Sequence, residues 1–460
     1  MSLLIKNGEV VTATDRYHAD IFCEGETITA IGKDLDVPPD AEVIDAKGKY
    51  VFPGFIDPHV HIFLPFMGTY AKDTYETASK AALIGGTTCF IDFAIPMKNE
   101  EPMDAYELWK SKSDGQAACD FSLHRAVTRY DDKAEAQIRE IVKDGITSFK
   151  VFLAYPGAFG VSDEELYKVL KLGKELGVIT CAHCENADII AQLQQKFLAE
   201  GKTGTEWHYH SRPPLVEAEG TRHFFNFAHM LDAAAYVVHL SCDLALKQAL
   251  EARYRGTRAY IEVVAPHLML DKTYAERPDF EGAKYVMSPP LREKWNQDVL
   301  WNALGQGIVN TVGTDHAPFD FEGQKPMGKD NFTLIPNGIP AIENRINLLY
   351  SYGVQKGKID LQRLVDCAST QAARIFGLFP RKGCIAPGSD ADLVVYDPDY
   401  RGTLSIENQA MNVDYCAFEG WEITGRPSVV TVRGEVAARD GKFVGTVGRG
   451  KLLKREPTHF

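Results

Sequence analysis

Six side chains of the types that bind metals stand within or directly after short apolar segments in five separate parts of the chain. Imidazole and carboxylate groups together suit zinc and similar divalent cations. A bound divalent cation can activate water for hydrolysis near neutral pH. The six residues are His59, His61, Lys150, His183, His239 and Asp315.

The spacing of the histidines indicates two metals rather than one. His59 and His61 are two positions apart, so on an extended strand their imidazoles point to the same side and can share one metal. His183 and His239 close two further apolar segments. On neighbouring strands, these two can share a second metal.

Lys150 and Asp315 complete the predicted centre. Two adjacent cations need an anion between them, and the ammonium of Lys150 would repel both. We therefore hypothesise that carbon dioxide carbamylates Lys150, which gives N6-carboxylysine, a bidentate carboxylate that bridges the metals. Asp315 is expected to bind one metal and to accept the proton of the water between them.

Each of these residues has an ordinary alternative explanation. A single histidine at a strand end is more often a hydrogen-bonded core or loop residue, a lysine can extend its amine towards solvent, and an aspartate often caps a helix. Six such residues on five strand ends favour metal binding, because buried ionisable groups are costly unless they are paired or bound to metal. Cys181 and Cys184 have the spacing of a metal-binding pair but no second pair, so we interpret them as small buried residues.

The elements that position these residues alternate between strand and helix, which is typical of parallel β/α units. Apolar residues recur at helical spacing in 164–176, and Ser162 and Glu165 have capping-box spacing before it. Segments 187–200 and 244–254 are similar, and 203–214 is predicted to be a long loop. The eight candidate strands are 52–61, 87–93, 121–127, 147–153, 178–183, 235–240, 259–265 and 309–314.

Eight such units predict an α/β fold, a (β/α)8 TIM-like barrel whose active site lies at the carboxyl ends of the strands. The two ends of the chain contain only short strands and turns, and neither could bury a sheet face alone. We therefore predict that both ends pair in one β-sandwich domain. The predicted domains are 1–52 with 385–460 for the sandwich and 53–384 for the barrel.

The composition excludes several classes of partner. The net charge of −13 argues against nucleic acid, whose phosphates attract basic surfaces. No apolar run is long enough to span a membrane. Nine scattered cysteines indicate reduced thiols, and a cytoplasmic location is the default expectation.

Several motifs carry a resemblance to a known family. They are Pro53-Gly54-Phe55-Ile56-Asp57-Pro58-His59-Val60-His61, Gly85-Gly86-Thr87-Thr88, Phe149 to Tyr155, Ser288-Pro289-Pro290-Leu291-Arg292, Gly313-Thr314-Asp315-His316-Ala317-Pro318 and Gly388 to Leu393. With these motifs the chain resembles the amidohydrolase superfamily over essentially its whole length. Within it, the chain is most similar to hydantoinases and dihydropyrimidinases, above all bacterial D-hydantoinases.

The resemblance implies two zinc ions, with His59, His61, carbamylated Lys150 and Asp315 around one. His183 and His239, with the bridging lysine, surround the other. It further implies that Tyr155 polarises the scissile carbonyl and that the backbone at Ser288 and Asn337 holds the ring amide. Family members usually form homotetramers, so a homotetramer or homodimer is expected here.

The expected reaction opens a cyclic ureide, either a 5-monosubstituted hydantoin or a dihydropyrimidine, to an N-carbamoyl amino acid, with D selectivity inferred from the resemblance. Activated water attacks a ring carbonyl, Tyr155 stabilises the oxyanion, and Asp315 passes the water proton to the leaving nitrogen. Phe63, Leu64, Phe66, Phe152 and Tyr155 are expected to form an apolar wall for the exocyclic substituent.

Three alternative functions stay open at this point. Dihydroorotases resemble the chain but carry an arginine where Phe63 stands, and an apolar ring cannot neutralise a carboxylate. Allantoinases act on a hydantoin whose polar tail suits the apolar wall less well. Collapsin-response proteins look alike and form tetrameric scaffolds without metal ligands, whereas all six ligand positions are filled here.

Overall fold

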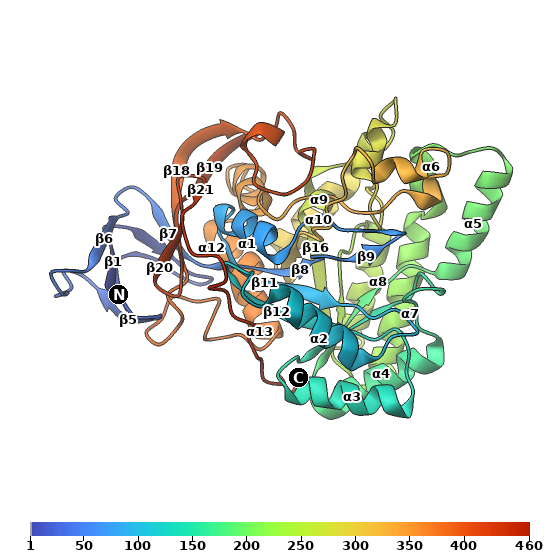
Figure 1. The fold of residues 1–460 in the computed structure, drawn as a ribbon, viewed down its shortest axis with the longest axis horizontal. Helices are drawn as coiled ribbons and strands as arrows, with labels where there is room; N and C mark the ends of the chain where they lie inside the picture. Colours follow the sequence, from blue (N-terminus) through green and yellow to red (C-terminus); the bar gives the residue numbers. More distant parts are fainter. Residues whose placement is uncertain (1) are drawn as a thin grey trace.

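The computed structural model describes residues 2–460 and divides them into a barrel and a sandwich. In Figure 1 the sandwich, built from the blue and red ends of the chain, lies beside the barrel that the middle of the chain forms. This arrangement confirms the predicted α/β class, the (β/α)8 barrel and the β-sandwich made by both chain ends.

The barrel consists of eight parallel strands that follow one another in sequence order. A parallel bridge between Val60 and His316 brings the first and last strands together, and the amide of Asp315 donates to the carbonyl of His59 at 2.9 Å. The strands are β8 (Phe55–Val60), β11 (Thr87–Ala94), β12 (Asp120–Ala126), β13 (Ser148–Phe152), β14 (Ile179–His183), β15 (Ala235–Val237), β16 (Ala259–Val264) and β17 (Thr311–Gly313).

The barrel strands are apolar because both of their faces are covered. Every residue of β8, β11, β12, β13 and β14 is buried. Side chains fill the inside of the barrel and helices cover the outside, as is usual for parallel sheets. A charged side chain in such a strand has no access to bulk water, so it needs a partner or a ligand.

The helices that connect the strands begin and end with recognisable signals. Before α4, Ser162 and Glu165 form the predicted capping box, and Gly177 ends the helix in the left-handed region at φ 68°. The long helices are α1 (Tyr75–Ile84), α2 (Pro102–Ser113), α3 (Asp132–Lys143), α4 (Asp163–Leu176), α5 (Ala187–Ala199), α7 (Pro214–Leu231), α8 (Asp243–Tyr254) and α10 (Trp295–Gly305). Shorter helices are α6 (Glu206–Ser211), α9 (Ala265–Met269), α11 (Arg345–Leu348), α12 (Leu361–Val365) and α13 (Gln371–Ile375).

The prediction of a loop over 203–214 was wrong in its middle. Residues Glu206–Ser211 form the short helix α6, and α7 already begins at Pro214. The sequence of this segment has no apolar periodicity that would predict a helix. Contacts with other segments, rather than an amphipathic face, stabilise α6. Nε2 of His208 donates to the carbonyl oxygen of Met287 at 2.8 Å, and Trp207 packs against Phe197 of α5 with ring centroids 4.9 Å apart.

Two sheets form the sandwich. β18 at the C-terminal end pairs with β7 at the N-terminal end, with Val394 opposite Phe52. The sandwich core contains Leu3, Ile21 and Val429, from both chain ends. One sheet orders β5 (Thr27–Gly32), β4 (Asp20–Glu24), β1 (Ser2–Lys6) and β6 (Glu42–Asp45). The other orders β21 (Lys442–Phe443), β20 (Glu435–Arg439), β19 (Glu422–Val432), β18 (Leu393–Thr403), β7 (Tyr50–Pro53), β2 (Glu9–Val11) and β3 (Arg16–His18).

The end of the chain leaves the sandwich and runs along the barrel. The amide of Leu453 donates to the carbonyl of Phe121 at 2.7 Å, and that of Arg455 donates to Gly145 at 2.8 Å. The exact domain boundaries at 52/53 and 384/385 stay predictions. Within residues 2–460, no helix is both long enough and apolar enough to cross a membrane.

Candidate metal centre and substrate cavity

The barrel brings all six predicted metal-binding residues to the carboxyl ends of its strands. Lys150 lies in β13, and His183 is the last residue of β14. His59 stands in β8 with His61 just beyond its end, and His239 and Asp315 each follow a strand by two positions. All six are buried, with exposed fractions of at most 8%.

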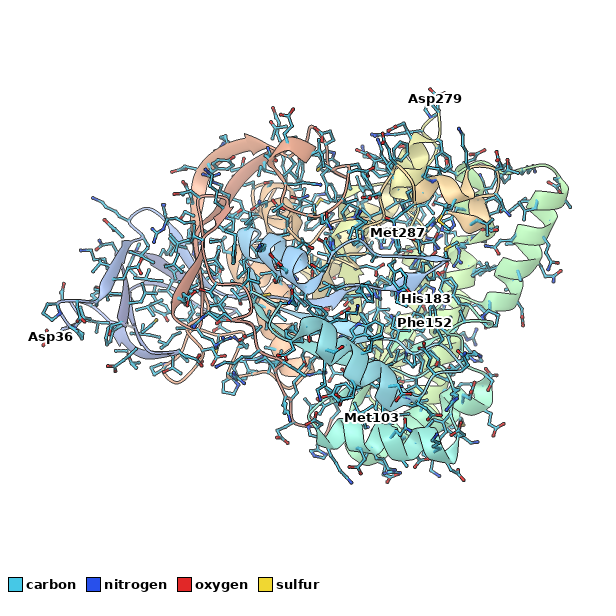
Figure 2. All side chains as sticks on the ribbon, viewed as in Figure 1. Asp36, Met103, Phe152, His183, Asp279 and Met287 are labelled. Atoms are coloured by element: carbon cyan, nitrogen blue, oxygen red, sulfur yellow. The ribbon has the colours of Figure 1, made fainter. Side chains whose placement is uncertain are left out.

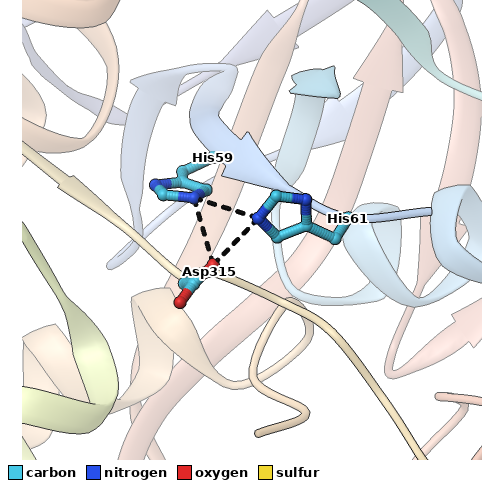
Figure 3. Close-up of side chains that lie close together, drawn as sticks. All are labelled: His59, His61 and Asp315. Carbon is cyan, nitrogen blue, oxygen red and sulfur yellow. Dashed lines mark hydrogen bonds and ion pairs between the residues drawn. The ribbon is translucent and has the colours of Figure 1, made fainter. Parts of the chain in front are cut away.

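His59, His61 and Asp315 converge on one point, as Figure 3 shows. Asp315 Oδ1 lies 3.0 Å from His59 Nε2 and 3.1 Å from His61 Nε2, and the two imidazole nitrogens are 3.3 Å apart. The three ligand atoms therefore surround a volume of the size that one metal ion needs.

His183 and His239 form the second predicted pair. Nδ1 of His183 lies 2.9 Å from Nε2 of His239. The ring of His239 also lies 5.4 Å from the ring of His59, measured between centroids, so the two groups of ligands adjoin. Lys150 places its Nζ 4.7 Å from the centre of the Phe93 ring and 4.9 Å from that of Phe152.

Two buried glutamates fix the tautomers of these histidines. Nδ1 of His59 donates to Glu262 at 2.6 Å, which leaves Nε2 free to bind a cation. Nε2 of His183 donates to Glu185 at 2.8 Å, which leaves Nδ1 free in the same way. Arg212 in turn binds Glu185 at 2.5 Å. Such carboxylate–histidine pairs are typical of the surroundings of protein metal sites.

Burial and charge shift the pKa values of this cluster in different directions. Burial lowers the pKa of His59, but Glu262 and Asp315 outweigh it and raise the value to about 9. Burial lowers the pKa of His61 to about 4 and that of Lys150 to about 8. A neutral His61 and an uncharged lysine amine are the forms that can act as a ligand and react with carbon dioxide, respectively.

The donor set fits divalent metals. Two imidazoles and a carboxylate with one shared focus, beside two more imidazoles, match the ligand types of zinc sites. A positive ion at the focus would satisfy the carboxylate of Asp315 and replace the proton that otherwise keeps His59 charged. His61 and His239 each keep a buried Nδ1 without a partner within residues 2–460.

Four of the predicted site residues adopt left-handed backbone conformations, which are uncommon outside glycine. The φ angles are 41° at His239, 53° at Asp315, 56° at Phe63 and 59° at Tyr155. The surrounding structure holds each one; the amide of His239, for example, donates to Glu262 at 2.9 Å. Backbone strain of this kind is concentrated at functional sites.

A cavity adjoins the metal ligands and joins them to the predicted substrate-binding residues. Phe152, His183 and Met287, which line it, are labelled in Figure 2 and come from β13, β14 and the loop after η2 (Glu281–Tyr285). The lining residues are His61, Leu64, Phe66, Ile95, Lys150, Phe152, Tyr155, Phe159, His183, His239, Met287, Ser288, Asp315, Ala317, Asn337 and Gly338.

The polar and apolar parts of the cavity wall are separate. Asn337 Nδ2 donates to Ser288 Oγ at 2.9 Å, next to Tyr155. Burial raises the pKa of the Tyr155 hydroxyl, which therefore keeps its proton and can donate it in a hydrogen bond. A second cavity of about 430 Å³ lies beyond Tyr155 and Asn337, lined by Ile190 among others, and offers room next to the first.

Phe63 does not line this cavity, unlike the other residues predicted for the apolar wall. Its ring stacks on Tyr70 with centroids 5.0 Å apart, and Lys112 lies over it at 4.0 Å. The backbone after His61 turns at Phe63, where φ is 56°, so Leu64 rather than Phe63 faces the ligands. The comparison with the arginine of dihydroorotases at this position consequently loses its structural basis.

Sequence reasoning did not find Glu185, Glu262 or Arg212. Glu185 follows His183 by two positions, which places it on the same side of an extended segment. Glu262 is a charged residue in the middle of an apolar strand, which is the signal that the sequence offers for it. For Arg212 the sequence offers no comparable signal, because it lies in the irregular segment around α6.

Comparisons with known proteins agree with this geometry. A protein-family model described as "Amidohydrolase family" matches residues 50–437. The chain is 48% identical to a D-hydantoinase of Geobacillus stearothermophilus over 99% of its own length and 97% of the relative's. It is 40% identical to a dihydropyrimidinase of Rattus norvegicus over 99% and 89% of the two lengths.

Among solved structures, the D-hydantoinase (dihydropyrimidinase) from Thermus sp. superposes with a TM-score of 0.98 and 64% identity, over 100% of both chains. The match therefore spans both the barrel and the sandwich. The chain therefore belongs to the amidohydrolase family.

Proposed function

We propose that this protein hydrolyses cyclic ureides, opening 5-monosubstituted hydantoins and dihydropyrimidines to N-carbamoyl amino acids. One observation carries the proposal: a single cavity joins five of the six candidate metal ligands, all but His59, to a polar edge at Ser288 and Asn337. Relatives named D-hydantoinase and dihydropyrimidinase support the same substrates.

Two zinc ions are the metals that this donor set suits best, and a carbamylated Lys150 would supply a further carboxylate ligand to them. When bound, such metals lower the pKa of water to about 7 and polarise a carbonyl group. His59, His61 and Asp315 would hold one ion, and His183 with His239 would hold the other. The chemistry that remains belongs to the side chains of the cavity.

Asp315, Tyr155 and the polar edge would divide the work of ring opening. Asp315 lines the cavity beside His61, where it would accept the proton of the attacking water and deliver it to the leaving ring nitrogen. The protonated hydroxyl of Tyr155 would donate to the developing oxyanion. Ser288 and Asn337 would orient the ring amide.

The apolar side of the cavity supports a preference for substituted hydantoins. Leu64, Phe66, Phe152 and Phe159 form a cluster beside the ligands. The rings of Phe152 and Phe159 have centroids 5.5 Å apart. A substituent on ring carbon 5 would pack against this wall in one enantiomer, and we propose the D form because the relatives and the solved structure are D-hydantoinases.

The experiment measures ring opening of dihydrouracil, D- and L-5-substituted hydantoins and allantoin together with the zinc content per subunit. In the wild type we expect turnover of dihydrouracil and of the 5-substituted hydantoins, with a preference for the D hydantoins, and two zinc ions per subunit. In Lys150→Ala we expect loss of activity and of at least one zinc ion. Two tightly bound metals and full activity in that variant would end the bridging role of Lys150. A metal-free wild type without turnover would favour a scaffold.

A homotetramer is part of the proposal, by analogy with the family resemblance. Sedimentation of the purified protein tests it: four times the mass of the 51.1 kDa chain is expected, and a monomer would contradict it.

A further inference from the structure

The carbonyl groups on both sides of Ser288 are already occupied by hydrogen bonds within the protein. Nε2 of His208 lies 2.8 Å from the carbonyl oxygen of Met287, and Nε2 of His267 lies 3.0 Å from that of Pro289. Both histidines are buried, and burial lowers the pKa of each. They are consequently neutral donors with one N–H directed at these carbonyl oxygens.

The same pattern surrounds Asn337. Lys325 lies in η3 (Lys325–Gly328), and its Nζ donates to the carbonyl oxygen of Pro336 at 2.7 Å and to that of Gly338 at 2.9 Å. It also donates to Val286 at 3.3 Å. The amide of Gly338 donates to the same Val286 carbonyl at 2.9 Å. Lys325 thus joins the segment that carries Asn337 to the segment that carries Ser288.

Ser288 and Asn337 themselves are the exceptions in these two segments. Within residues 2–460, neither the backbone N–H nor the carbonyl of either residue makes an internal hydrogen bond. Both residues line the cavity beside the metal ligands. Unpaired backbone groups in the wall of this cavity are available to a ligand, so the protein presents a donor and an acceptor at both positions.

Lys325 holds its position without a carboxylate. Its side chain is fully buried, and among the described residues no acidic oxygen lies within ion-pair distance of Nζ. Three carbonyl oxygens call for three N–H donors, which only the ammonium form supplies, because a neutral amine would turn its lone pair towards one of them.

We propose that Lys325 is a positioning residue for the substrate: it takes up the carbonyls on both sides of Asn337 and ties this segment to Val286, two residues before Ser288, so that the backbone groups of Asn337 and Ser288 face the ring. This inference rests on the proposed function. It also gives a physical reason why the substrate is a cyclic amide. An amide within a small ring is held cis and presents its N–H and C=O along one edge. An open-chain amide is trans, with the two groups on opposite sides.

The test compares Lys325→Met with Lys329→Met, an exposed lysine of the same segment, in the zinc-loaded enzyme. The substrates are dihydrouracil and hydantoin, and the measured quantities are KM, kcat, zinc per subunit and the thermal midpoint. We expect KM to rise about tenfold or more in K325M while kcat stays within about threefold, because uniform substrate binding is lost. Zinc content should not change, and K329M should match the wild type.

The conservative variant Lys325→Gln keeps two N–H donors and should show an intermediate KM; it also serves if K325M does not accumulate. A lower thermal midpoint in K325M or K325Q with an unchanged KM would overturn the positioning role, leaving a purely structural lysine. If the wild type and K329M opened no ring at all, the proposed function would fail, and this inference with it.

Discussion

At the scale of single residues, the site depends as much on the groups that orient the ligands as on the ligands. Glu262 accepts from Nδ1 of His59 and from the hydroxyl of Tyr236 at 2.8 Å, and it also holds the amide of His239. One carboxylate therefore controls a ligand of each predicted metal. Only a fully buried acceptor can do this, because water would otherwise compete for the same donors.

We predict that Glu262→Gln weakens metal binding about 10- to 100-fold, since the amide can present an N–H to His59 and favour the wrong tautomer. The measurement is zinc retained per subunit after dialysis against a graded series of chelator concentrations. Glu251→Gln, at an exposed position of α8, is the matched control. Equal zinc retention in the two variants would show that Glu262 does not orient the ligand.

At the scale of elements, the loop between β13 and α4 positions Tyr155. The amides of Ala158, Phe159 and Gly160 all donate to the carbonyl of Tyr155, at 3.0, 3.0 and 2.8 Å. The loop then returns to the barrel, where Val161 donates to Phe152 at 3.0 Å. These bonds stabilise the left-handed conformation of Tyr155, which directs its hydroxyl into the cavity.

The two glycines of this loop offer a matched test. A Cβ at Gly160 would lie 2.5 Å from the carbonyl oxygen of Ala154 and 3.0 Å from Cα of Pro156, whereas a Cβ at Gly157 would meet nothing within 4 Å. We predict that Gly160→Ala lowers kcat/KM about ten- to hundredfold, because Tyr155 is displaced. Gly157→Ala should leave it within about twofold. Similar values in both variants would mean that the loop tolerates the displacement.

At the scale of the whole molecule, a buried ion network joins the barrel to the sandwich. Lys382 lies 2.7 Å from Asp120, the first residue of β12, and 2.6 Å from Asp392, which precedes β18. It also lies 3.0 Å from Asp390, and Arg433 binds Asp120 from the other side. Lys382 is 2% exposed, so its removal would leave buried carboxylates without a counter-ion.

We predict that Lys382→Met destabilises the protein by about 3–5 kcal/mol, the usual effect of breaking a buried ion pair by removing one partner. Denaturant titration followed by circular dichroism measures the change. Lys356→Met, at an exposed position, should have almost no effect. A loss below about 1 kcal/mol in K382M would mean that the network contributes little to the attachment of the two parts.

Glu343 provides a prediction about pH at the same scale. Its carboxylate accepts from the amide of Ala410 at 2.6 Å, and burial raises its pKa from 4.5 to about 7, with Asp73 nearby acting in the same direction. Because the folded pKa is the higher one, the protonated acid favours the fold. Its contribution is fully present below about pH 4.5 and is lost as the pH rises towards 7.

The effect reaches about 3 kcal/mol at most, from 1.36 kcal/mol for each pKa unit. We therefore expect Glu343→Gln, which imitates the neutral acid, to melt near the wild type at pH 5 and above it at pH 8. Differential scanning calorimetry of both proteins across this range measures the difference. A difference in melting temperature between the two proteins that is independent of pH, or that becomes smaller as the pH rises, would contradict the raised pKa of Glu343.

The sequence by itself determined the barrel, the sandwich and which six residues are the candidate metal ligands. Alternating strand and helix patterns and histidines two apart are local features, and the periodicity of the backbone converts them directly into faces and strand ends. Motif resemblance added Tyr155, Ser288 and Asn337, all of which line the cavity.

Only the tertiary structure decided where Phe63 points, that residues 206–211 form a helix, and which buried charges serve the site. Phe63 depends on a single backbone turn, and Glu262, Lys325 and Lys382 depend on partners that lie far away in the chain. Local patterns carry no information about such contacts. They arise when distant segments close around the same low-dielectric interior, where each polar group must find a partner.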